Sequence, residues 1–163
     1  MLASARFNSK TFSERQEYMD NKKVMCYGTQ NKIKSSVPLN TLLFVVEMNN
    51  EKNQIMGVGL IRNMVSPKPC AIYKDHNYNR YTYTGEYRLT REQMEELDEE
   101  VVSILDIILF KGYTHIKRHS GITIIPPKLL YDVRARGANL TERVKEMFLN
   151  TFKKINEKIN YEY

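Results

Sequence analysis

Two largely apolar segments separated by a polar run predict two neighbouring strands in the first half of the chain. The segments 41–48 and 54–61 are rich in β-branched and aromatic residues, and the polar run 49–53 separates them. A polar connection of this length is typical of a hairpin, so we expect the two strands to be antiparallel. Gly57 and Gly59 leave alternate positions of the second strand without side chains, which predicts a tight bend or a close backbone approach.

The clearest helical pattern runs from about 91 to 111. Thr90 and Gln93 have the spacing of a capping box at its start, and Gly112 is a natural stop at its end. One side of this predicted helix is apolar at Met94, Leu97, Val101, Ile104, Leu105 and Ile108.

Two further helices are expected towards the ends of the chain. The first lies near 12–20, where Thr11 and Glu14 have the spacing of a capping box. The second covers 141–159, where apolar residues recur at helical spacing and lysines occupy the other faces.

Shorter segments complete the predicted sheet. Strands are expected at 23–27, 70–73, 113–118 and 121–125. Tyr81, Tyr83 and Tyr87 occupy alternate positions, so they share one face of a further strand. Short strands flanked by helices indicate an α+β fold, and we expect about six or seven strands to close into a small β-barrel. We expect one domain over 1–163, with 141–163 as a C-terminal helix packed on it.

Charge is distributed unevenly along the 163 residues. The formal net charge is +6, with 25 Lys and Arg against 19 Asp and Glu. Residues 91–100 hold six acids and one base, so the rest of the chain carries 24 bases and 13 acids, a net +11. A basic body favours anionic partners such as RNA or single-stranded or modified DNA. The acidic helix over 91–110 is a candidate surface for a protein partner.

The cysteines and the apolar runs bear on the compartment. Cys26 and Cys70 are the only cysteines, and the chain does not open on an apolar leader. The longest apolar runs fall far short of a membrane span. We therefore expect reduced thiols, no membrane association and a cytoplasmic or nuclear location.

Basic and aromatic residues gather in the segment 111–127. His115, Lys117 and Arg118 lie within it, and three more bases follow at Lys128, Arg134 and Arg136. These six residues are candidate contacts to nucleic-acid phosphates. The alternative interpretation is the solvated side of an edge strand, where lysines oppose aggregation.

Tyrosines are the candidates for stacking on a base. Tyr27, with Tyr81 or Tyr83, would supply the ring faces if these side chains are exposed. Burial in the core is the commoner fate of alternating aromatic residues, so both interpretations stay open.

Enzymatic signals in the sequence are weak. A nuclease site could combine His115, His119 and Lys117 with Asp75, as general acid, base and phosphate clamp. The sequence contains no glycine-rich phosphate loop and no nucleophile elbow. The three histidines and two cysteines do not have metal-ligand spacing, so we expect neither a metal nor a cofactor.

Several segments resemble the YTH and EVE branch of the PUA-like fold. Val24–Lys32 is similar to the short strand and threonine-containing turn of that group, and Leu42–Asn49 to a strand reading like LLFSVN. Ile55–Ile61 follows as a GVAEM-like strand, and Asn63–Pro67 ends in the Ser-Pro that often comes next. The resemblance covers about residues 20–90.

This resemblance implies a small barrel that holds one flipped, modified base in an aromatic pocket. Cys26, Tyr27, Gly28 and Thr29 would line the pocket. YTH readers of methylated adenine build their cage largely from tryptophan, which this chain lacks. The resemblance therefore assigns the cage to Tyr27 with one further tyrosine, namely Tyr73, Tyr78 or Tyr81. The acidic helix over 91–110 is not a standard part of a YTH domain.

Together these features predict non-enzymatic binding of RNA or modified nucleic acid, with a base in an aromatic pocket and the backbone on a basic surface. Two alternatives stay open. One is a nucleic-acid-processing enzyme that uses His115 or His119, and the other is a protein-interaction module that uses the helix over 91–110.

Overall fold

The computed structural model describes residues 1–153. Its strands are β1 (Leu2–Phe7), β2 (Met25–Thr29), β3 (Leu42–Asn49), β4 (Gln54–Arg62), β5 (Tyr81–Gly85), β6 (Tyr87–Thr90) and β7 (Thr123–Ile124). Its α-helices are α1 (Ser9–Lys22), α2 (Arg91–Phe110), α3 (Pro127–Leu130) and α4 (Leu140–Thr151), and two 3-10 turns are η1 (His76–Asn79) and η2 (Val133–Ala135).

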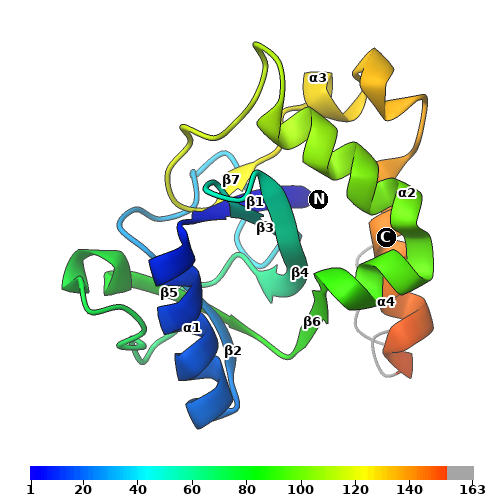
Figure 1. Cartoon of the computed structure of the whole chain (residues 1–163). Helices are drawn as coiled ribbons and strands as arrows, with labels where there is room; N and C mark the ends of the chain where they lie inside the picture. Colours follow the sequence, from blue (N-terminus) through cyan, green and yellow to red (C-terminus); the bar gives the residue numbers. More distant parts are fainter. Residues whose placement is uncertain (154–163) are drawn as a thin grey trace.

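The strands of the described residues form two sheets (Figure 1). The larger sheet has the order β6-β4-β3-β1-β7, with β1 parallel to β3 and every other pair antiparallel. The smaller sheet is the antiparallel pair β2-β5. The predicted α+β class and the predicted hairpin of β3 and β4 are confirmed. The predicted small barrel is not, because residue 86 separates β5 from β6 and the two strands pair with different partners.

The nearly continuous apolar run of β3 is explained by burial on both of its faces. Phe44, Val46 and Met48 belong to a core formed with α2 and α4. Leu43 and Val45 point the other way, into a second core formed with α1 and the smaller sheet. Figure 1 shows the same layering, with α2 and α4 on one side of the larger sheet and α1 and β2 on the other.

The predicted helices are present with revised boundaries. The capping box of Thr90 and Gln93 is confirmed at the start of α2. The N-cap of α1 is Asn8 rather than Thr11. The Asn8 side chain accepts a hydrogen bond from the Thr11 amide, and the Thr11 hydroxyl accepts one from the Asn8 amide. The described part of the predicted helix over 141–159 is α4, and residues 154–159 lie outside the described residues.

Four strand predictions are wrong in place or extent. The strand expected to carry Tyr81, Tyr83 and Tyr87 on one face is two strands, β5 and β6, which belong to different sheets. β1, which pairs on both sides, lies in a segment where no strand is predicted. The segments 70–73 and 113–118 contain no strand, and 121–125 contains only the two residues of β7. The basic segment is therefore a loop between α2 and β7.

Candidate functional site

A cavity of about 290 Å³ lies where β1 and β2 end. The first turn of α1, the turn between β3 and β4, and the loops before η1 and β7 complete its walls. The residues that line it are Ala5, Arg6, Phe7, Asn8, Thr11, Tyr27, Gly28, Thr29, Gln30, Asn50, Tyr73, Tyr78, Ser120 and Gly121. Five separate segments of the chain thus meet at one hollow.

One wall of the cavity is aromatic. The rings of Tyr73 and Tyr78 pack edge to face, with centroids 6.0 Å apart. Tyr73 is buried, while Tyr78 is 41% exposed. The Asn79 side chain fixes this loop, because it accepts hydrogen bonds from the Ile72 and Tyr73 amides and donates one to the Tyr73 carbonyl. The cavity wall therefore contains one buried ring, Tyr73, and one partly exposed ring, Tyr78.

Gly28 allows this aromatic loop to lie against β2. A Cβ atom at residue 28 would stand 2.5 Å from the Tyr78 carbonyl oxygen and 3.0 Å from a ring carbon of Tyr73. Any side chain there would push the loop away from the strand. The glycine thus sets how closely the two walls of the cavity approach.

Arg6 brings an unpaired positive charge to the cavity. One terminal nitrogen of its guanidinium donates to the Lys117 carbonyl, which also accepts from the side-chain Nδ2 of Asn50 at 2.9 Å. Its Nε is buried without a hydrogen-bond partner among residues 1–153. Burial lowers the pKa of Arg6, and no carboxylate of the described residues pairs with it.

Other arginines in the described part of the chain differ from Arg6 in this respect. Each of five has a raised pKa and an ion pair with a carboxylate: Arg15, Arg88, Arg91, Arg134 and Arg143. A half-buried guanidinium without an anion is unfavourable, since desolvation costs free energy that a counter-charge normally offsets. Arg6 is therefore suited to an anionic ligand.

His119, in the loop whose Lys117 carbonyl binds Arg6, also has a buried nitrogen without a hydrogen-bond partner among residues 1–153. This nitrogen is Nδ1, and the residue is half-buried. Burial lowers the pKa of His119, and the positive charges of Arg6 and Lys34 lower it further. The imidazole is therefore neutral near pH 7 and lies in a positive environment.

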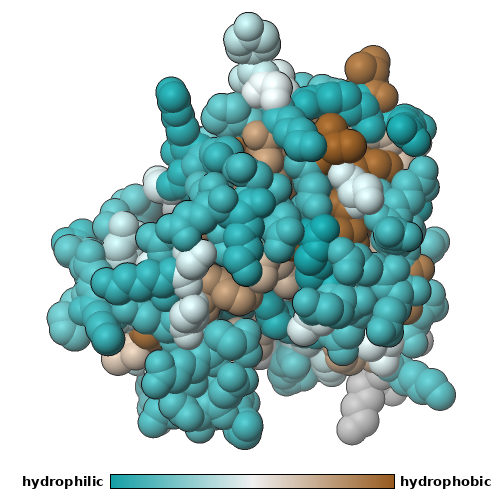
Figure 2. Space-filling view, viewed as in Figure 1, coloured by the Kyte–Doolittle hydropathy of each residue, from teal (hydrophilic) through white to brown (hydrophobic). Residues whose placement is uncertain are grey.

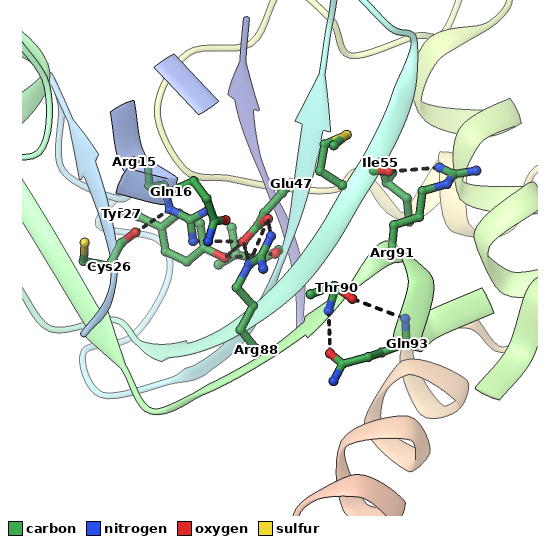
Figure 3. Close-up of polar contacts among 12 residues, drawn as sticks. Arg15, Gln16, Cys26, Tyr27, Glu47, Ile55, Arg88, Thr90, Arg91 and Gln93 are labelled. Carbon is green, nitrogen blue, oxygen red and sulfur yellow. Dashed lines mark hydrogen bonds and ion pairs between the residues drawn. The ribbon is translucent and has the colours of Figure 1, made fainter. Parts of the chain in front are cut away.

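Tyr27, which lines the cavity, belongs to a buried charge network (Figure 3). Glu47 of β3 accepts hydrogen bonds from Arg15 of α1 at 2.9 Å, from Arg88 of β6 at 2.6 Å and from the Tyr27 phenol of β2 at 2.8 Å. Arg15 also donates to the Cys26 carbonyl at 2.6 Å, and its guanidinium carbon lies 4.2 Å from the centroid of the Tyr27 ring. One carboxylate thus joins elements of both sheets and α1.

Electrostatics keeps Glu47 ionised. Burial alone would raise the pKa of this carboxyl, but Arg15 and Arg88 outweigh that effect and hold the pKa at about 2. Burial, together with the Glu47 charge, raises the pKa of the Tyr27 phenol well above its usual range. Tyr27 therefore stays protonated and donates to Glu47.

Gly57 and Gly59 make room for the network, which confirms the close approach predicted for this strand. A Cβ at residue 59 would stand 2.2 Å from the Tyr27 phenol oxygen. A Cβ at residue 57 would stand 3.2 Å from Arg88 and 3.3 Å from Glu47.

The segment predicted as a pocket, 26–29, lies at the cavity, but its members differ in access. Gly28 and Thr29 line the cavity, and the Thr29 hydroxyl donates to the Asn31 carbonyl at 2.6 Å. Tyr27 also lines it, yet Tyr27 is only 1% exposed and Arg15 covers its ring. Cys26 is buried behind the wall. Tyr27 is thus part of the support and not an open stacking face.

The other predicted stacking residues lie elsewhere. Tyr83 is a core residue whose phenol oxygen accepts from the Ile33 amide at 3.0 Å. Tyr81 is half-buried, with Lys32 5.4 Å from its ring centroid. Neither of them lines the cavity.

Some of the predicted phosphate contacts are exposed, and others form hydrogen bonds or ion pairs within the protein. Arg118, Lys128 and Arg136 are exposed. Lys117 donates to the Asn53 side chain at 2.6 Å. Arg134 forms an ion pair with its neighbour Asp132 and donates to the Lys111 carbonyl, so it holds two loops together.

The alternative catalytic residues are only partly brought together. His115 and His119 line a shared shallow hollow with Gly112, Tyr113 and Arg118, and the His115 Nδ1 accepts from the Lys117 amide at 3.3 Å. Asp75 instead caps η1 by accepting from the Asn77 amide at 3.0 Å, and it lines neither this hollow nor the cavity. The nuclease constellation is not assembled here.

The sequence analysis assigned no site role to several residues that line the cavity, among them Arg6, Phe7 and Asn50. A charged residue that follows the small residues of 3–5 was the available signal for Arg6. The sequence carries no signal that would assign Asn50 to the site, because the position of Asn50 depends on the register of the β3-β4 turn.

No protein-family model, curated protein or solved structure matches this chain. Within residues 1–153, no three His, Cys, Asp or Glu side chains are grouped so as to hold a metal ion. None of the helices in the same part of the chain has the length and apolarity that a membrane span requires.

Proposed function

We propose that this chain binds RNA or modified nucleic acid without catalysis and holds one base in the cavity between β1 and β2. The observation that carries this proposal is the combination of an aromatic wall, Tyr73 and Tyr78, with the unpaired guanidinium of Arg6 in one hollow. Rings favour a flat ligand, and the guanidinium favours an anion. A nucleotide has both a flat base and an anionic phosphate.

The size and chemistry of the cavity fit this class of ligand. A volume of about 290 Å³ is near the small end of ligand pockets, which suits a single planar group better than an extended molecule. Asn8, Thr11 and Asn50 add short polar groups at its edge. Such groups could read the hydrogen-bonding edge of a base.

The position of the cavity is compatible with the resemblance to the YTH and EVE branch of the PUA-like fold. That resemblance implies a base pocket at 26–29, and the cavity lies at this segment. In this chain the stacking role passes from tryptophan to Tyr73 and Tyr78. We propose a divergent relationship to that fold on these grounds.

Fluorescence anisotropy tests the proposal. Labelled single-stranded RNA and DNA, each with and without a modified base, would be titrated with the protein at two salt concentrations. Tyr78→Ala and Arg6→Gln should each weaken binding about tenfold or more, because they remove a stacking face and a phosphate partner. Leu39→Ala is the control, since Leu39 is exposed and lies outside the cavity.

Two results would reject the proposal. The first is wild-type affinity in both cavity variants. The second is the absence of binding to every oligonucleotide at low salt. Turnover of the oligonucleotide that is lost in His119→Ala would favour the enzymatic alternative instead.

A further inference from the structure

Two tyrosines outside the cavity are almost fully open to solvent. Tyr113 is 108% exposed and Tyr131 is 85% exposed, beside Val133 at 91%. Figure 2 shows hydrophobic surface at the upper right of the molecule, over α2 and over the turn η2 that follows α3. Tyrosine is enriched at interaction surfaces, where its ring is apolar and its hydroxyl contacts water, so the two exposed rings are candidate contacts to a ligand.

Arg134 joins the two loops that carry these tyrosines. Its guanidinium donates to the Lys111 carbonyl at 2.7 Å and to the Thr114 hydroxyl at 2.9 Å, on either side of Tyr113. The same guanidinium pairs with Asp132, the residue after Tyr131. One side chain therefore connects the loop that carries Tyr113 to the turn that carries Tyr131.

The segment that carries both tyrosines is strongly basic. Residues 111–136 contain six Lys and Arg and the single acid Asp132, a net +5. Asp132 is itself paired with Arg134. Around the tyrosines, Arg118, Lys128 and Arg136 remain exposed. Aromatic rings among basic side chains match the pattern of proteins that bind single-stranded nucleic acid. In those proteins the phosphate backbone follows positive charge and the nucleobases stack on aromatic side chains.

The loop that carries Tyr113 also reaches the cavity. It begins after α2 and ends with Ser120 and Gly121, which line the cavity wall. Arg6 and Asn50 fix its middle by binding the Lys117 carbonyl. A strand with one base in the cavity would therefore meet this loop as it leaves the site.

We infer that Tyr113 and Tyr131 form a second stacking site, which binds the bases that adjoin the one held in the cavity and so makes the ligand a single strand of several nucleotides. This inference rests on the proposed function. A duplex would not fit it, because paired bases do not offer free faces to the two rings.

A length series tests the inference. Anisotropy would compare a single-stranded trinucleotide with a single strand of about twelve nucleotides, within the range of site sizes known for such proteins. The variants are Tyr113→Ala combined with Tyr131→Ala, and the matched pair Tyr113→Phe combined with Tyr131→Phe, which keeps both rings. Leu39→Ala serves as the control for the loss of an exposed apolar side chain.

The alanine pair should bind the longer strand about tenfold or more weakly and the trinucleotide as wild type does, while the phenylalanine pair keeps most of the affinity. Equal affinity of the alanine pair and wild type for the longer strand would overturn the inference, even if Tyr78→Ala still weakens both ligands. If Tyr78→Ala and Arg6→Gln change nothing while the alanine pair loses the longer strand, the second site stands and the proposed base pocket fails. No binding of either ligand by wild type would overturn both.

Discussion

Gly59 of β4 lies directly against the phenol of Tyr27, so that a Cβ on residue 59 would stand 2.2 Å from the phenol oxygen. The missing side chain is what lets Tyr27 reach Glu47. The glycine, the tyrosine and the carboxylate come from three strands, and their contact joins the smaller sheet to the larger one.

Gly59→Ala should therefore destabilise the fold by about 2 kcal/mol, the usual scale for overpacking a core. Urea unfolding would measure the loss. Tyr27→Phe removes the atom that clashes, so the double variant should lose less stability than the sum of the two single variants. Simple additivity of the two losses would show that the clash is absorbed elsewhere.

Acid should unfold the protein through Glu47. The folded-state pKa of about 2 lies below the ordinary value of 4.5, so the carboxylate contributes stability that is complete above about pH 4.5 and is lost as the pH falls towards 2. The contribution is roughly 3 kcal/mol at neutral pH. Urea unfolding between pH 7 and pH 2, with the Glu47 carboxyl carbon followed by NMR, would measure both quantities. A Glu47 signal that titrates near 4.5 would contradict this account.

Gly28→Ala should weaken the binding of nucleic acid more than it weakens the fold. A methyl group at this position meets the Tyr78 carbonyl at 2.5 Å and would displace the loop that carries the aromatic wall. Thr84→Ala is the control, because Thr84 is exposed on β5, the strand paired with β2. Anisotropy would show the loss in Gly28→Ala alone, and wild-type affinity in that variant would mean that the wall does not contact the ligand.

Salt dependence should separate the basic residues into two groups. Arg118→Gln, Lys128→Gln and Arg136→Gln should each reduce the slope of log affinity against log salt by about 0.7, the contribution of one phosphate of a single strand. Arg134→Gln should instead lower the melting temperature, because Arg134 binds Asp132, Lys111 and Thr114. Identical slopes in all four variants and wild type would remove the electrostatic part of the proposal.

The sequence predicts the parts of the fold that depend on local patterning. The β3-β4 hairpin and α2 were found because a polar turn and a capping box are short-range signals. β1 was missed because Ala3, Ser4 and Ala5 have no branched or aromatic side chain. Their small size suits the interior of a sheet that is covered on both faces, and this context is not visible in the residues themselves.

The candidate site was predictable only in part, for a similar reason. The resemblance indicated the segment 26–29 and one further ring from Tyr73, Tyr78 or Tyr81. Residues 27–29, Tyr73 and Tyr78 line the cavity, whereas Cys26 and Tyr81 do not. Arg6 and Asn50 come into place only through the parallel pairing of β1 with β3. The basic segment 113–118 alternates like a strand, but Ile116 is its only buried side chain, so it has no sheet face to cover.

The position of β1 also bears on the order in which the sheet forms. β1 is the earliest strand in the chain, yet its two partners are β3, whose first residue is 42, and β7, which ends at residue 124. Pairings between such distant segments form slowly, because closing a long loop costs conformational entropy before any stabilising contact is made. During synthesis, one edge of β1 therefore stays unpaired until β3 has been made. The other edge stays unpaired until β7, close to the end of the described chain, has been made. The wall of the cavity that holds Arg6 is then among the last parts to be completed.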